Sequence, residues 1–271
     1  MSTCVRLGGS VTVAILLFPV VARAQVPVRS EAGGLVFLVV PTVFFALARL
    51  VFPPEGQETH LTTIEIHGPP PPTGSAVVSW DDEGRATVRA TRVRVPISID
   101  GVLDESFYET TASIPALIQT VPDGGAAPTE RTESWVGFDD DNVYVAARMW
   151  ESVPESEWTA NEMRRDASTI RANDNFGLFL DTYYDRRNSV GLYMTPLGGF
   201  SDLQMTNEGS PNFDWNAVWD IRTGRFDGGW TVEIAIPFKS LRYRGGRDQI
   251  WGIQLRRFVV RKNEWSHLTA L

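Results

Sequence analysis

From residue 85 onward, apolar and polar residues alternate in short runs that are separated by Gly, Asp and Asn. Such alternation turns one face of a strand toward a core and the other toward water. The pattern predicts strands over residues 86–93, 97–99, 132–138, 143–150, 176–181, 189–194, 219–226, 229–236 and 250–260. A helical turn is expected at 104–108, with Asp104 as its N-cap. Because the strands are short and do not alternate with helices, the sequence predicts an all-β antiparallel β-sandwich.

The beginning of the chain has the pattern of a secretory signal peptide. Arg6 precedes an apolar segment over residues 11–21, and Ala22-Arg23-Ala24 has the form of a cleavage site. We therefore expect a signal peptide over residues 1–24 and export to the periplasm or the outer membrane.

A second apolar run covers residues 35–52 and is interrupted by Pro41 and Arg49. It is compatible with a membrane anchor, with a second signal segment that ends at Ala46-Leu47-Ala48, or with a partly buried helix. The signal interpretations are favoured because the sequence becomes polar immediately afterwards. Residues 25–79 as a whole are expected to form this apolar segment and a Pro-rich linker, and residues 80–271 the folded domain.

Composition narrows the range of functions. The 271 residues are 43% hydrophobic and 21% charged, which is typical of a globular protein, and the formal net charge of -8 argues against a nucleic-acid partner. The one cysteine, Cys4, lies in the expected signal peptide. A role based on thiols or disulfides is therefore excluded for the mature chain.

Tryptophans supply the strongest candidate for a binding site. Trp215 and Trp219 stand four residues apart among Asp and Asn residues, and Trp150 and Trp158 flank the exit of a predicted strand. A sugar ring presents an apolar face to an aromatic ring and needs polar partners for its hydroxyls. We therefore expect these four side chains to bind a carbohydrate, although core positions are an equally plausible place for tryptophan.

Charged residues around residues 164–187 add a second part to this site. Arg164 could hold sugar hydroxyls or an acidic polymer through its planar guanidinium, and Asp174 is a candidate hydrogen-bonding partner. The alternative is a surface of salt bridges that keeps the loops in register. The mid-strand tryptophans Trp135, Trp230 and Trp251 are expected in the core.

An acidic hairpin loop is the candidate metal site. Asp139, Asp141 and Asn142 could contribute oxygen ligands to calcium, together with more distant ligands. Alternatively, these residues favour a tight turn and face water.

Nothing in the sequence supports catalysis. Glycoside hydrolysis needs two carboxylates at a defined separation, which no spacing on loops establishes. The serines lie in no G-x-S-x-G motif, and His60 and His67 fall in the expected linker. The sequence predicts a non-catalytic protein.

A family resemblance completes the sequence analysis. Residues 99–105, Ile-Asp-Gly-Val-Leu-Asp-Glu, resemble the opening of family 9 carbohydrate-binding modules. Further segments follow in order at 129–133, 138–148, 161–166, 173–176, 180–188, 219–226 and 229–243. Together they resemble exported bacterial proteins of the DUF5916 type, whose C-terminal β-barrel region would begin where this chain stops. The chain is therefore expected to be a fragment or a truncated form.

The resemblance implies carbohydrate binding, an association with polysaccharide catabolism, and structural calcium. Two alternatives follow from the same fold. One is a structural domain that docks onto an outer-membrane β-barrel, and the other is an accessory region of a glycoside hydrolase.

Overall fold

The structure is a computed structural model that describes residues 25–29, 35–39, 68–246 and 249–270. Its strands are β1 Gln25–Arg29, β2 Leu35–Val39, β3 Val78–Trp80, β4 Ala86–Val88, β5 Thr91–Arg92, β6 Ile118–Val121, β7 Thr132–Phe138, β8 Asn142–Trp150, β9 Asn175–Asp181, β10 Ser189–Met194, β11 Phe200–Met205, β12 Asp220–Phe226, β13 Gly229–Pro237, β14 Gly252–Val259 and β15 Glu264–His267. The helical elements are α1 Ser106–Thr110 and the 3-10 turns η1 Glu155–Glu157, η2 Ile170–Ala172, η3 Phe238–Ser240 and η4 Val260–Lys262.

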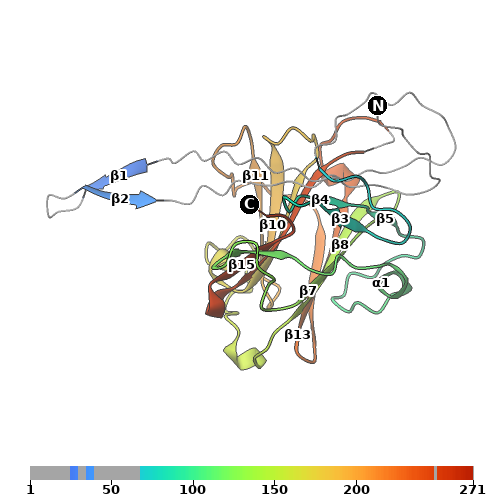
Figure 1. Ribbon diagram of the computed structural model, residues 1–271, viewed down its shortest axis with the longest axis horizontal. Coiled ribbons are helices and arrows are strands. Elements are labelled where there is room, and N and C mark those ends of the chain that lie inside the picture. Colours follow the sequence, from blue (N-terminus) through green and yellow to red (C-terminus); the bar gives the residue numbers. More distant parts are fainter. Residues whose placement is uncertain (1–24, 30–34, 40–67, 247–248, 271) are drawn as a thin grey trace.

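Two sheets form the body of the protein (Figure 1). The six-stranded sheet has the order β11-β10-β9-β14-β15-β6, and the five-stranded sheet has the order β12-β13-β8-β7-β5. All neighbouring strands in them are antiparallel except β5 and β7, which are parallel. β3 and β4 form a separate antiparallel pair. The expected all-β sandwich is therefore confirmed.

The main core lies between the two sheets and follows the alternation of the sequence. In β9, Phe176, Leu178 and Leu180 enter this core, whereas Phe179 packs in a cluster on the opposite face of the same sheet. Trp230 and Trp251 are fully buried in the core. Trp135 is also buried, in a cluster with Phe107 and Tyr108 of α1. The core positions expected for these three tryptophans are confirmed.

Several predicted elements differ from those observed. Residues 97–99 form no strand, and Ile97 instead packs with α1 against the five-stranded sheet. The helix begins at Ser106, with Glu105 rather than Asp104 at the N-cap and no side-chain capping bond. The expected strand over 86–93 is divided into β4 and β5, which pair with different partners.

The N-terminal predictions are only partly covered by the described residues. Residues 1–24 and 40–67 lie outside them, and residues 35–39 form β2, which pairs with β1. Among the described residues, no helix is long and apolar enough to cross a membrane. The end of the expected linker contacts the sandwich, because the Thr87 hydroxyl donates to the carbonyl of Pro69 at 2.6 Å.

Candidate functional site

A pocket of about 620 Å³ lies at the β9, β10 and β11 side of the six-stranded sheet. Its lining combines the aromatic residues Trp215 and Tyr183 with hydroxyl, amide and charged side chains. The polar lining residues are Thr182, Asp185, Asn188, Ser189, Gln204, Thr206, Ser240 and Arg242. Volume and composition are those of a site for a small polar ligand that has an apolar face.

Trp215 lies on the loop between β11 and β12 and is half-buried. This loop is held in place by Asp202 of β11, whose side chain is fully buried. One Asp202 carboxylate oxygen accepts the Ala217 N–H at 2.8 Å and the Trp219 indole N–H at 3.2 Å, and Arg165 forms an ion pair with it at 3.1 Å. Asp202 therefore positions the loop that carries Trp215.

Trp219 has a different role from Trp215. It is half-buried, packs against the main core, and meets Phe200 edge to face with 5.2 Å between the ring centroids. Its indole nitrogen is held by Asp202 at 3.2 Å. The pocket lining includes Trp215 and not Trp219, so the structure does not combine them into one aromatic surface.

The polar side of the pocket is built by the turn between β9 and β10. Asp181 is fully buried and accepts the backbone N–H groups of Tyr183 at 3.1 Å and Arg186 at 2.6 Å. Burial raises the pKa of Asp181 to about 6, against the lowering effect of these N–H bonds. The turn contains left-handed backbone at Tyr184 and Arg186, with φ of 52° and 61°.

Within the same turn, Asp185 and Asn188 bind each other. The Asp185 carboxylate accepts the backbone N–H groups of Arg187 and Asn188 at 2.8 and 2.9 Å and the Asn188 side-chain amide at 2.6 Å. The Asn188 side-chain carbonyl oxygen (Oδ1) accepts the Asn207 backbone N–H at 3.1 Å. The pocket wall is therefore preorganised by hydrogen bonds before any ligand arrives.

Trp150 and Trp158 lie elsewhere. Trp150 pairs with Gly229 at one end of β13, whereas Asp220, which follows Trp219, pairs with Ala235 near the other end. The Trp150 ring contacts Phe226 edge to face at 5.5 Å, and the Arg131 guanidinium carbon lies 4.1 Å from its centroid. The structure therefore does not place Trp150 opposite Trp219.

Trp158 is fixed by two contacts. Its indole N–H donates to the Val153 carbonyl at 3.2 Å, and the Arg225 guanidinium carbon lies 5.3 Å from its ring centroid. The ring also packs against the main core. In the described structure Trp158 supports the strand exit.

Arg164 and Asp174 have internal partners. Arg164 is exposed and forms an ion pair with Glu162 at 3.0 Å. Asp174 is 2% exposed, and its two oxygens accept the backbone N–H groups of Thr159 at 2.8 Å and Val260 at 2.7 Å. Burial raises the pKa of Asp174 despite these bonds. We assign Asp174 to the fold, where it joins two distant loops.

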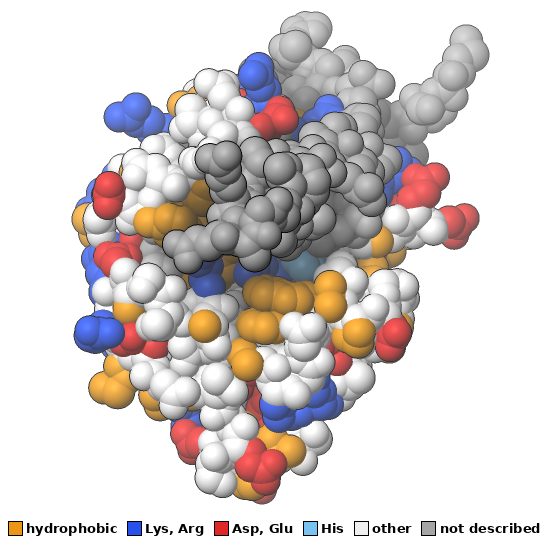
Figure 2. Space-filling view, turned by 90° about the vertical axis from the view of Figure 1, so that its left-hand side faces the viewer, with side chains coloured by type: hydrophobic (Ala, Val, Ile, Leu, Met, Phe, Trp, Pro, Cys, Tyr) orange, Lys and Arg blue, Asp and Glu red, His pale blue; other side chains and the backbone are white. Residues whose placement is uncertain are grey.

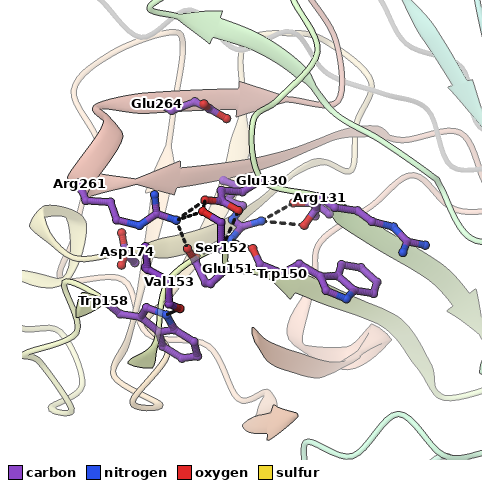
Figure 3. Close-up of polar contacts among 12 residues, drawn as sticks. Glu130, Arg131, Trp150, Glu151, Ser152, Val153, Trp158, Asp174, Arg261 and Glu264 are labelled. Atoms are coloured by element: carbon purple, nitrogen blue, oxygen red, sulfur yellow. Dashed lines mark hydrogen bonds and ion pairs between the residues drawn. The ribbon is translucent and has the colours of Figure 1, made fainter. Parts of the chain in front are cut away.

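Figure 3 shows a buried ionic cluster next to Asp174. Arg257 and Arg261 bind the two oxygens of Glu151 at 2.5 and 2.7 Å, and Arg261 also pairs with Glu130. Burial alone would raise the pKa of Glu130, but hydrogen bonds from Lys262, Arg261 and Ser152 lower it to about 2. Because the arginines come from the β14 side and Glu151 follows β8, the cluster joins the two sheets.

The acidic hairpin loop is closed by its own hydrogen bonds. Asp139 accepts the N–H groups of Asp141 at 2.8 Å and Asn142 at 2.7 Å, and the Tyr144 hydroxyl donates to it at 2.7 Å. No group of three or more His, Cys, Asp or Glu side chains that could hold a metal occurs among the described residues. Calcium binding at Asp139, Asp141 and Asn142 stays a prediction.

Sequence reasoning missed several residues that build the pocket. Tyr183 and Asn188 reach it from the turn between β9 and β10, Gln204 from β11, and Arg242 from the segment after η3. Asp202 is a lone acid in the middle of β11, and nothing in the local pattern distinguishes it from a solvent-facing strand residue. Only the folded arrangement brings these residues to Trp215.

No family model and no curated protein matches this sequence. Among solved structures, the chain is similar to a putative carbohydrate-binding protein from Bacteroides uniformis ATCC 8492, with 8% identity, a TM-score of 0.53, and coverage of 67% of this chain and 88% of that one. It is also similar to a family 9 carbohydrate-binding module from Caldicellulosiruptor kristjanssonii. The module in complex with cellotriose is 16% identical, with a TM-score of 0.47 and coverage of 66% of this chain and 82% of that one.

The same module in complex with glucose has a TM-score of 0.45, 16% identity, and coverage of 66% of this chain and 85% of that one. At 8% identity, the similarity to the Bacteroides protein is one of fold alone.

Proposed function

We propose that the sandwich binds a carbohydrate at the pocket of Trp215, without catalysing a reaction on it. The observation that carries the proposal is the combination of Trp215 and Tyr183 with polar side chains in one pocket of about 620 Å³. A sugar ring can lie with its C–H face on an indole, while its hydroxyls bind amide, hydroxyl and guanidinium groups. Tyr183 is 37% exposed, so its ring is accessible to a ligand.

The lining of the pocket favours binding over hydrolysis. Among the described residues that line it, Asp185 is the only carboxylate, and its oxygens already accept hydrogen bonds from its own turn. Hydrolysis of a glycosidic bond by the usual route requires a second carboxylic acid across the bond. A polysaccharide panel is therefore expected to yield no new reducing ends.

Calorimetric titration of the full chain against a glycan panel tests the proposal. The panel contains glucose and cellotriose, the sugars present in the two Caldicellulosiruptor structures. Trp215→Ala is expected to weaken binding about tenfold or more, because truncating an aromatic anchor removes a large contact area. Trp150→Ala is the matched control, since that ring lies away from the pocket. Equal affinities for the wild type and Trp215→Ala would contradict the proposal.

The wider setting of this function extends the proposal. Four further points stay predictions. They are export through a signal peptide at residues 1–24, location in the periplasm or the outer membrane, a part in polysaccharide catabolism, and kinship with the DUF5916-type proteins. Calcium also belongs to this group, and it is tested by repeating the titration with added calcium and with a chelator. Docking to an outer-membrane β-barrel is the alternative function. It predicts that substitutions in the Trp215 pocket leave docking unchanged.

A further inference from the structure

The outer face of the six-stranded sheet, away from the main core, carries an arginine, Arg256, whose guanidinium lies over the rings of Phe179, Tyr193 and Trp265. Arg256 of β14 stands beside Gly177 of β9, which in turn pairs with Tyr193 of β10. A Cβ atom on Gly177 would lie 2.7 Å from the Arg256 Cγ, so glycine is required for the arginine to cross β9. The side chain of Arg256 is thereby laid along the sheet rather than extended into water.

Aromatic rings from both sides of β14 enclose the Arg256 guanidinium. Its central carbon lies 4.4 Å from the ring centroid of Trp265 in β15 and 4.6 Å from that of Tyr193. Trp265 also stacks on Phe258, with 3.8 Å between the ring centroids and 6° between the planes. When the faces of a guanidinium are covered by rings, its N–H groups remain along the edge.

Arg256 has no polar partner within the part of the chain that the structure describes. The side chain is 5% exposed, and its buried Nε atom makes no hydrogen bond. Its neighbour Arg257 points to the other face of the sheet, where it pairs with Glu151 and donates to the Arg131 and Trp150 carbonyls. A buried cation without a counterion is costly, so an anion that binds the Arg256 guanidinium would offset this cost.

The surroundings of Arg256 add further positive charge. Burial lowers the pKa of Arg256, and the charge of Arg171 acts in the same direction. His267, opposite Arg256 on β15, has its pKa lowered to about 3 by burial and by the Arg256 charge, so it stays neutral. Figure 2 shows a face on which hydrophobic and Lys/Arg side chains lie together. In a chain of net charge -8, Arg256 and Arg171 form a local cationic site.

We infer that Arg256 forms a second ligand subsite, which binds the carboxylate of a uronic-acid-containing glycan beside the Phe258 and Trp265 rings. A guanidinium edge matches a carboxylate through paired hydrogen bonds, and the partly buried aromatic rings offer contact to the rest of the sugar. The choice of a sugar acid rather than a peptide carboxylate rests on the proposed function. The site is separate from the Trp215 pocket, whose lining does not include Arg256.

The test is calorimetric titration of the full chain with trigalacturonic acid, with cellotriose as the neutral probe and hexaglutamate as the peptide probe. We expect trigalacturonic acid to bind, and rising salt to weaken it, because the contact is ionic. Arg256→Met should weaken this binding about tenfold or more, and Arg256→Lys by less, since lysine keeps the charge but lacks the planar fork. Arg92→Met is the matched control, because Arg92 is exposed and pairs with Asp140 on the other sheet.

Thermal unfolding accompanies each titration. Removing an unpaired buried charge is expected to leave the unfolding midpoint of Arg256→Met unchanged or higher, and Arg256→Lys serves if the Met variant does not fold. Absence of trigalacturonic acid binding, or equal binding by Arg256→Met, would overturn the inference. If hexaglutamate binds equally well and depends on Arg256 in the same way, the ligand of this subsite is a peptide carboxylate and the sugar-acid inference is overturned.

Trp215→Ala separates this inference from the proposed function. If both are right, this variant loses affinity for neutral sugar and keeps its affinity for trigalacturonic acid. Loss of both affinities would place the acidic ligand in the Trp215 pocket and overturn the subsite. Trigalacturonic acid binding that depends on Arg256, without any dependence of neutral sugar on Trp215, would support the subsite and refute the Trp215 proposal.

Discussion

The buried carboxyl of Glu233 is expected to make the stability of the sandwich fall between acidic and neutral pH. Glu233 lies in β13 and is fully buried, and it accepts the N–H groups of Asp100 at 3.1 Å and Gly101 at 2.7 Å and the Tyr108 hydroxyl at 2.8 Å. It therefore ties α1 and the preceding loop to the five-stranded sheet. Burial raises its pKa to about 7, although these hydrogen bonds act in the opposite direction.

The sign and the size follow from this pKa. The folded state holds the Glu233 proton up to a pKa of about 7, whereas the unfolded chain releases it near 4.5. The stabilising contribution is therefore complete below pH 4.5 and is lost as the pH rises to 7. A shift of this size corresponds to roughly 3 kcal/mol of unfolding free energy, at about 1.4 kcal/mol per pKa unit.

Urea unfolding of the wild type and Glu233→Gln across pH 4 to 8 measures the effect. Glutamine is neutral throughout, so the difference in unfolding free energy between the two proteins should change by roughly 3 kcal/mol across this window. Glu157→Gln, an exposed site, should follow the wild type. Parallel pH profiles for the wild type and Glu233→Gln would refute the reasoning.

Two further predictions concern the loop of Trp215 and the turn at Gly101. Asp202→Ala should reduce the free energy of unfolding by about 2–4 kcal/mol and weaken sugar binding, because the Ala217 N–H, the Trp219 indole and Arg165 lose a buried acceptor. Asp214→Ala on the same loop is the control. Titration and unfolding curves of Asp202→Ala that equal those of the wild type would contradict this role. Gly101→Ala should lower the free energy of unfolding by about 1–3 kcal/mol, since φ of Gly101 is +89° and a Cβ would lie 2.8 Å from the Gly224 nitrogen. A urea unfolding midpoint equal to that of the wild type would disprove this prediction.

The fold could be predicted where alternation and turn residues agree. The residues 132–138 and 189–194 were expected as strands, and β7 and β10 have these bounds. β6 and β15 have four residues each, which is too short for a periodic pattern to identify them. Residues 97–99 alternate as a strand does, but they pack against α1 and the sheet without entering a ladder.

The candidate site was predictable only in part, because sequence spacing does not determine which side chains meet. Trp215 lines the pocket, while Trp219, four residues later, supports the loop through Phe200 and Asp202. Asp174 was expected to contact a ligand, but its carboxylate is used by backbone N–H groups of two loops. Contacts between residues that are far apart in the sequence cannot be recognised from the local pattern of apolar and polar residues.

The central claim is that the Trp215 ring contacts a bound sugar. The most direct measurement is the ¹H–¹⁵N NMR spectrum of the indole N–H groups, assigned by Trp→Phe substitutions, during titration with the sugar that binds best in the panel. The account predicts that the Trp215 indole signal shifts with the ligand, while the signals of the buried Trp230 and Trp251 stay in place. A Trp215 signal that remains unchanged at saturating sugar would contradict it.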